Sequence, residues 1–178
     1  QDILARLGHG KVIESIGIDF TASSPLPAAE DGTALSAHLP NDPHAYVKLW
    51  KHGAVQPFAD AINSRGGAFL DHFGGKLSGE WLLAKAAQIA NDAPQVWART
   101  ARFIESGDWL VWHLTGTEAR SLGFAAYKAQ YSEPAGYPDI VEGLLDKLAV
   151  PLPVGSPAGS LSAAWRAKTG IEGSAVVA

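Results

Sequence analysis

The sequence predicts an α/β protein with several helices for each strand, on three observations. The run VIESIGIDF at residues 12–20 alternates between apolar and polar residues and is rich in isoleucine, which favours a buried strand. Apolar residues recur at helical spacing across residues 79–90, behind Ser78 as a candidate cap. The run SGDWLVWHL at residues 106–114 predicts a compact amphipathic helix that Gly116 closes.

Turn and cap signals predict the remaining elements. An Asx residue followed by proline, at Asn41-Asp42-Pro43, predicts the start of a helix over residues 44–63, which Gly53 and Pro57 should bend or break. In chain order, the other predicted elements are a helix end at 1–10, a hairpin tip at 30–33, a helix at 91–97, a strand at 102–104, helices at 139–148 and 161–169, and a strand that begins at 174. Residues 117–131 are small and polar, then aromatic, and carry no predicted element.

Length and charge limit the classes of function. The 178 residues suit one domain with a sizeable core, or a piece of a larger protein. Hydrophobic residues make up 47% and charged residues 18% of the chain, which is typical of a globular protein. The formal net charge is −4, and Lys and Arg form no block longer than two, so we expect neither nucleic acid nor an acidic membrane as a partner.

Several common kinds of site have no support in the sequence. The chain has no cysteine, which excludes a disulfide framework and a thiolate metal site. Neither a Walker-type nor a GxGxxG phosphate loop occurs, and the six histidines show no metal-binding spacing. No apolar run is long enough to span a membrane and no signal peptide is visible at residues 1–11, so a soluble, cytoplasmic protein is expected. The oligomeric state stays open, and a homo-oligomer is compatible with the sequence.

Two clusters combine small or aromatic residues in a way that suits a ligand site. The run DFTAS at residues 19–23 follows a predicted strand, where small residues let a ligand approach the backbone, although an ordinary tight turn is the simpler explanation. In the run VKLWKH at residues 47–52, Trp50 could stack on sugar C–H groups and donate from its indole N–H. Alternatively, Trp50 belongs to the core and the neighbouring lysines extend around it.

Two further clusters contain charged residues. The run GGKLSGEWLLAK at residues 74–85 places Glu80 in the first turn of a predicted helix, where a carboxylate complements the helix dipole, and a structural role explains it well. The run RSLGFAAYKAQY at residues 120–131 places Lys128 among small residues and tyrosines. Its ammonium group could donate to sugar hydroxyls or stabilise a developing negative charge, and a solvated lysine beside packed tyrosines explains the same pattern.

Taken in this order, the clusters resemble the ribulokinases, which form a group within the FGGY carbohydrate kinase family. The matching segments are GIDFTAS at 17–23, NDPHAYVKLWKH at 41–52, GGKLSGEW at 74–81, FIESGDWLVWHLTG at 103–116, AAYKAQY at 125–131 and the tail at 153–178. The resemblance extends over nearly the whole chain. Its most specific part is PHAYVKLWKH followed by GGKLSGEW, because other FGGY kinases have helices similar to ESGDWLVWHLTG.

The resemblance implies a fold, a reaction and a set of contacts. The fold would be a ribonuclease-H-like, actin-like ATPase domain. The reaction would transfer the γ-phosphoryl group of ATP, with Mg²⁺, to a hydroxyl of ribulose, foremost the C5 hydroxyl of L-ribulose. The resemblance further implies that the backbone of Ala22 lies against the sugar and that Trp50 and Lys128 hydrogen-bond its hydroxyls, with Thr21 and Glu80 as neighbours of these contacts.

Three parts of the family pattern would lie outside residues 1–178. These are the first strands with their phosphate turn, the nucleotide-binding second domain, and the catalytic aspartate, which is expected just after Ala178. The chain is therefore expected to be a partial N-terminal sugar-binding domain that holds no catalytic residue and is inactive alone. Two alternatives stay open: a kinase for D-ribulose, ribitol or xylulose, and a sugar-binding module without catalysis.

Overall fold

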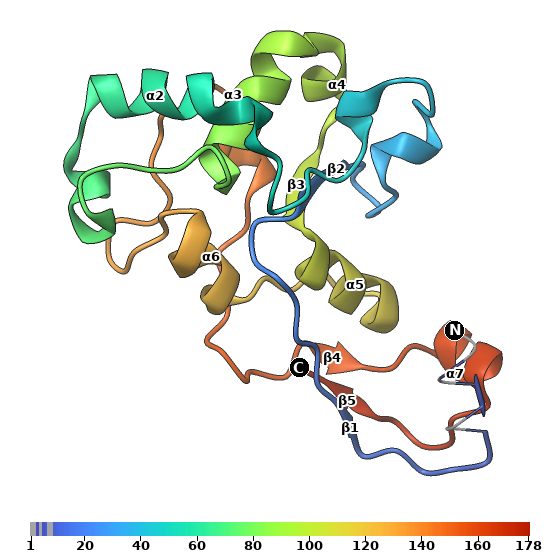
Figure 1. Ribbon diagram of the computed structural model, residues 1–178. Coiled ribbons are helices and arrows are strands. Elements are labelled where there is room, and N and C mark those ends of the chain that lie inside the picture. Colours follow the sequence, from blue (N-terminus) through green and yellow to red (C-terminus); the bar gives the residue numbers. More distant parts are fainter. Residues whose placement is uncertain (1–2, 4, 7–8) are drawn as a thin grey trace.

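The computed structural model describes residues 3, 5–6 and 9–178 and contains two small sheets with helices packed against both (Figure 1). The strands are β1 (Ser15–Ile16), β2 (Pro25–Ala28), β3 (Arg102–Glu105), β4 (Gly159–Ser160) and β5 (Val176–Val177). The α-helices are α2 (Gln56–Arg65), α3 (Leu82–Asp92), α4 (Pro94–Arg99), α5 (Ser106–Thr115), α6 (Leu122–Lys128) and α7 (Ala163–Thr169). Short 3₁₀ helices are η1 (Leu35–Ala37), η2 (Pro43–Ala45), η3 (Gly53–Val55), η4 (Ala68–Phe73) and η5 (Leu145–Lys147).

The antiparallel pair of β2 and β3 supports the larger core. All four residues of β2 are buried, with Leu26 opposite Ile104 and Pro27 opposite Phe103. A strand can contain two prolines only where no partner needs their missing N–H groups, and within this sheet β2 pairs on one side alone. The carbonyl of Pro25 instead accepts a hydrogen bond from the backbone N–H of Lys48, at 2.8 Å, which joins the loop after η2 to the sheet.

Helices α2, α3 and α4 pack over this pair of strands. Leu83, Ile89 and Val96 are fully buried there, and the ring of Phe103 meets that of Trp97 edge to face at 5.8 Å. Seven of the eleven residues of α3 are buried, so this helix lies in the middle of the core. A charged residue on its inner face must therefore find partners inside the protein.

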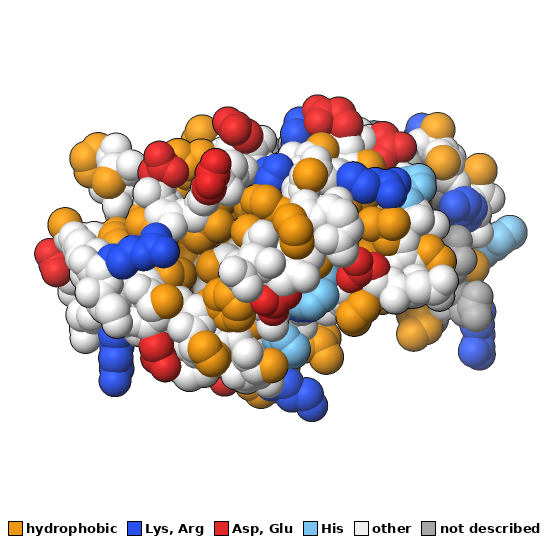
Figure 2. Space-filling view, turned by 90° about the horizontal axis from the view of Figure 1, so that it is seen from above, with side chains coloured by type: hydrophobic (Ala, Val, Ile, Leu, Met, Phe, Trp, Pro, Cys, Tyr) orange, Lys and Arg blue, Asp and Glu red, His pale blue; other side chains and the backbone are white. Residues whose placement is uncertain are grey.

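The second sheet has the order β1-β5-β4, with β5 parallel to β1 and antiparallel to β4. Its Val177 packs with Val111 and Leu114 of α5, and α5 follows directly on β3. Helix α5 thus connects the two sheets, as Figure 1 shows. Seen from above, the molecule carries acidic and basic side chains scattered among hydrophobic ones (Figure 2). In the described part of the chain, no helix has the length and apolar character needed to cross a membrane.

Several predicted elements are confirmed where a local stop signal marks them. The turn at 30–33 closes with a hydrogen bond from the N–H of Ala29 to the carbonyl of Thr33. Helices α5 and α7 end at Gly116 and Gly170, which both adopt the left-handed conformation that glycine tolerates. The strand predicted at 102–104 is β3. The predicted helix end at 1–10 falls partly on residues outside the described ranges.

The prediction of one helix over residues 44–63 is wrong. The side chain of Asp42 does accept a hydrogen bond from the N–H of His44, at 2.9 Å, but it begins only the single turn η2. Pro57 does not break a helix, because it occupies the first turn of α2, where a missing N–H is harmless. Trp50 consequently lies in a loop between η2 and η3 and not on a helix.

Other boundaries also differ from those expected. Helix α3 begins at Leu82 because the Ser78 hydroxyl accepts from the N–H of Glu80 within a turn, which leaves Trp81 as the N-cap. The strand predicted at 12–20 forms a regular strand over Ser15–Ile16, with an isolated bridge between Val12 and Glu172 before it. The helix predicted at 139–148 is wrong, since η5 is the regular element found there, whereas α6 forms inside the segment for which no element was predicted.

We expect Leu83→Ala to lower the free energy of unfolding by about 2–5 kcal/mol, because Leu83 is fully buried and its removal leaves a cavity. Val150→Ala is the control: its side chain is 80% exposed, and the change should stay within about 0.5 kcal/mol. Urea unfolding followed by circular dichroism measures both. Equal effects of the two substitutions would contradict this description of the core.

Candidate functional site

An open pocket of about 650 Å³ lies where the segment after β1 meets α6 and Trp50. Its volume is in the range typical of small-molecule sites. The lining residues are Ile18, Asp19, Phe20, Thr21, Ala22, Trp50, Ser121, Gly123, Phe124, Tyr127, Lys128 and Val154. In Figure 1 the segment between β1 and β2 passes between α6 and α5.

The structure brings four of the five sequence-predicted residues to this pocket. Thr21, Ala22, Trp50 and Lys128 all line it, although they come from three separate segments of the chain. Glu80 is not among the lining residues. Its backbone carbonyl accepts a hydrogen bond from the hydroxyl of Ser23, at 2.5 Å, so Glu80 supports the loop that carries Ala22 from behind.

Trp50 presents a partly exposed indole to the pocket. The side chain is 43% exposed, which argues against the alternative that it belongs to the core. Its position is fixed through the backbone, because its N–H donates to the hydroxyl of Ser24 at 3.2 Å. An indole held in this way can offer a face for stacking and an N–H for hydrogen bonding.

Lys128 is the last residue of α6, a helix whose N-terminus is capped by the side chain of Ser121. The cap accepts a hydrogen bond from the N–H of Gly123, at 3.1 Å. The half-buried Lys128 has its ammonium 5.4 Å from the centre of the ring of Tyr127, which is exposed. A lysine at the end of a short capped helix has a fixed base, and its ammonium has three donors for ligand hydroxyls.

Apolar residues form the opposite part of the lining. Phe20, Phe124, Tyr127 and Val154 contribute it; the first three fall within the candidate runs at 19–23 and 120–131, but sequence reasoning named none of the four as a contact. Gly107 at the start of α5 permits this packing, since a Cβ atom there would lie 2.6 Å from the ring of Phe124. The sequence alone does not group these residues, because they come from the segment after β1, from α6 and from the loop after η5.

Lys85 is a functional candidate that sequence reasoning missed. It lies on the inner face of α3 and is fully buried. Its ammonium donates to the carbonyl of Ser23 at 2.5 Å and of Leu49 at 2.9 Å, and it lies 3.3 Å from the carbonyl of Lys48. Burial lowers the pKa of Lys85 to about 8. The sequence did contain one signal, since Lys85 falls within the apolar stripe of a helix.

Glu105, at the end of β3, was missed as well. One of its carboxylate oxygens accepts from the N–H of Ser24 at 2.8 Å, and the other has no hydrogen-bond partner among the described residues. Burial raises the pKa of Glu105 to about 7, and the hydrogen bond from Ser24 opposes that rise. The next residue, Ser106, donates its hydroxyl to the carbonyl of Ser24. Strand β3 and the start of α5 thus hold Ser24 by both its N–H and its carbonyl.

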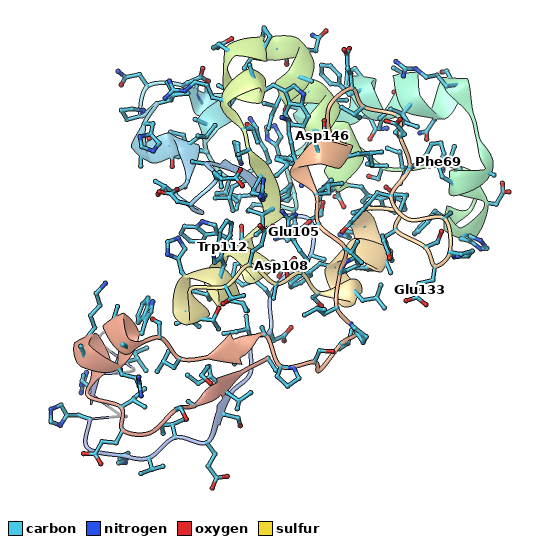
Figure 3. The ribbon with its side chains drawn as sticks, turned by 180° about the vertical axis from the view of Figure 1, so that it is seen from behind. Phe69, Glu105, Asp108, Trp112, Glu133 and Asp146 are labelled. Carbon is cyan, nitrogen blue, oxygen red and sulfur yellow. The ribbon has the colours of Figure 1, made fainter. Side chains whose placement is uncertain are left out.

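A second hollow of about 400 Å³ adjoins the pocket and shares part of its lining. Asp108 of α5 lies on it, one turn from Glu105, and Figure 3 shows both carboxylates where β3 runs into α5. Burial raises the pKa of Asp108 to about 7, against a hydrogen bond of 2.9 Å that its carboxylate accepts from the N–H of Ser121. Among the described residues, no group of three or more histidine or acidic side chains could hold a metal ion.

Comparison with known proteins identifies sequence relatives of this chain. It is 40% identical to a ribulokinase of Bacillus licheniformis over 94% of this chain and 34% of the relative. It is 39% identical to a ribulokinase of Mycolicibacterium smegmatis over 93% of this chain and 32% of the relative, and 46% identical to that of Halalkalibacterium halodurans over 69% and 23%. The chain therefore spans about a third of the length of these relatives or less. No protein-family model matches it.

Solved structures of sugar kinases share the fold. A xylulose kinase from Brucella ovis superimposes with a TM-score of 0.72 at 18% sequence identity, over 94% of this chain and 34% of that structure. A gluconate kinase from Lactobacillus acidophilus gives a TM-score of 0.71 at 13% identity, over 99% and 35%. At such low identity the likeness concerns the fold alone, and it confirms the predicted α/β, actin-like architecture of the FGGY kinases.

We expect the stability of the protein to fall as the pH rises from about 5 to about 7.5, partly because of Glu105. Its pKa is higher in the folded than in the unfolded state, so the folded state binds the proton more tightly, and ionisation in this window favours unfolding. Glu105→Gln keeps an acceptor for Ser24 and removes the titration. Across this window it should reduce the loss of unfolding free energy by about 2 kcal/mol.

Urea unfolding at the two pH values measures the difference between the parent protein and Glu105→Gln. Asp108, which titrates in the same range, should leave a residual slope in the variant. Parallel pH dependences of the two proteins would show that Glu105 does not titrate as its burial implies.

Proposed function

We propose that this chain is the sugar-binding part of an ATP-dependent kinase. The chain is related by sequence to the ribulokinases and has the fold of the FGGY carbohydrate kinases. The reaction proposed for the intact protein is the phosphorylation of ribulose, foremost of L-ribulose to L-ribulose 5-phosphate. Because ATP is a cytoplasmic cosubstrate, the protein is assigned to the cytoplasm.

One observation supports this proposal above the others: Ala22, Trp50 and Lys128 line one open pocket. A sugar presents C–H groups on its faces and hydroxyls around its edge. The indole can stack on the C–H groups, and the indole N–H and the ammonium can donate to hydroxyls. The small side chain of Ala22 leaves room for a hydroxyl to approach the main chain, with Thr21 beside it.

The role proposed for these residues in the reaction is positioning. Phosphoryl transfer depends on placing the attacking hydroxyl in line with the γ-phosphate and on excluding water. We assign to this chain the first task, the orientation of the sugar hydroxyl. Bound ATP would supply the transferred phosphoryl group, with Mg²⁺ to neutralise its charge, and, as the resemblance implies, we assign both to other parts of the intact protein.

Trp50→Ala in the intact protein should raise the KM for ribulose on the order of tenfold and leave the KM for ATP within about twofold, because the stacking surface and one donor are lost. Trp165→Ala is a matched control. Trp165 lies outside the pocket, and its indole donates to the backbone carbonyl of His113 at 2.7 Å. Coupled measurement of ADP formation gives both constants.

The same assay with L-ribulose, D-ribulose, xylulose and ribitol decides which sugar is preferred. A rise of both KM values by the same factor in Trp50→Ala would point to a folding role for Trp50. No turnover of any of the four sugars by the intact protein would refute the proposed function and favour a binding module without catalysis.

Gly107→Ala should raise the KM for ribulose several-fold, because a Cβ atom at Gly107 would displace the ring of Phe124 in the pocket wall. Gly53→Ala is the control, since its Cβ atom would meet no heavy atom within 4 Å. An unchanged KM in Gly107→Ala would mean that the apolar wall does not contact the sugar.

A further inference from the structure

The ammonium of Lys85 connects two segments that are far apart in the sequence. Its acceptor in the first segment is the carbonyl of Ser23, 62 residues away, and its acceptors in the second are the carbonyls of Lys48 and Leu49, 37 and 36 residues away. Ser23 directly follows Ala22, and Leu49 directly precedes Trp50. This buried side chain, which does not line the pocket, therefore joins two of its parts, in addition to the direct hydrogen bond from the Trp50 N–H to the Ser24 hydroxyl.

The peptide unit between Ser23 and Ser24 is held from several sides. Ser23 has a φ of 68°, a conformation that a residue with a side chain adopts only when its surroundings impose it. The Ser23 hydroxyl donates to the carbonyl of Glu80, and the Ser23 carbonyl accepts from Lys85. On the other side, Glu105 accepts from the Ser24 N–H and Ser106 donates to the Ser24 carbonyl.

This arrangement keeps a charged group in the protein interior. A buried ammonium is costly unless it is fully hydrogen-bonded, and apolar packing alone would be satisfied by Leu or Met at this point of α3. The buried carboxylate of Glu105 nearby opposes the fall of the Lys85 pKa. Two buried ionisable side chains thus act on the same loop, and neither lines the pocket.

We propose that Lys85 and Glu105 are positioning residues that set the distance between the backbone of Ala22 and the indole of Trp50, and so determine the affinity of the pocket for its sugar. The identity of the ligand rests on the proposed function, whereas the mechanical role of the two residues does not. Loss of either should let the loop at 21–24 relax from its strained conformation and move away from Trp50.

The experiment compares Lys85→Met with Lys147→Met in the intact protein. Methionine preserves most of the apolar stem and removes the ammonium. Lys147 is a matched control because its ammonium also donates to a backbone carbonyl, that of Thr100 at 2.8 Å, and lies outside the pocket. A second pair tests the other side of the loop: Glu105→Gln retains an acceptor for Ser24, and Glu105→Leu does not.

Two readouts are measured on each variant. In Lys85→Met, hydrogen exchange should become faster at both 21–24 and 47–50, and the ribulose KM should rise on the order of tenfold with an ATP KM within about twofold. Lys147→Met should leave both readouts unchanged. Glu105→Gln should restore most of the sugar affinity that Glu105→Leu loses.

The outcomes separate this proposal from the proposed function. If the intact protein turns over none of the four sugars, the proposed function fails and hydrogen exchange alone decides. Unchanged exchange at 21–24 and 47–50 in Lys85→Met overturns the positioning role, as does a change in ribulose KM no larger than that of Lys147→Met. If Lys85→Met does not fold, the Glu105 pair decides, and equal ribulose KM values for Gln and Leu overturn the proposal.

Discussion

The hydrogen bonds of the buried Lys85 ammonium are the interaction on which the arrangement of the pocket depends. They join α3, the centre of the larger core, to the loops that carry Ala22 and Trp50. Ala22 and Trp50 both lie in irregular segments outside the strands and helices, and the hydrogen bond from the Trp50 N–H to the Ser24 hydroxyl joins these segments to each other but not to α3. Lys85 therefore connects the rigid core to the pocket, which is built largely from irregular backbone.

The fold was predictable from sequence where the signal is local. Helices α5 and α7 carry their own glycine stops, and β3 is a short run of bulky residues. The helix over 44–63 was wrong because a good cap at Asp42 guarantees one turn and no more. The path of the chain beyond that turn depends on contacts such as the hydrogen bond from Lys48 to the carbonyl of Pro25, which periodicity does not reveal.

The site was predictable only in part, and for a similar reason. Resemblance pointed to Ala22, Trp50 and Lys128, and the structure places them on one pocket, although their roles stay a prediction. Glu80 came from the same motif but contributes a backbone carbonyl behind the loop. Lys85 was visible as a charged residue inside an apolar stripe. Its acceptors are carbonyls from distant segments. Because every residue has a main-chain carbonyl, the sequence does not indicate which of them accept a hydrogen bond.

The construction of the pocket from three remote segments links its occupancy to the folding equilibrium of the molecule. The loop at 18–22, the loop that holds Trp50, and α6 meet only when both sheets and the helix α5 between them are in place. A ligand that binds only this folded arrangement would therefore stabilise the entire molecule against unfolding by mass action. Conversely, a weakened core residue remote from the pocket would look, in a binding assay, like a loss of recognition.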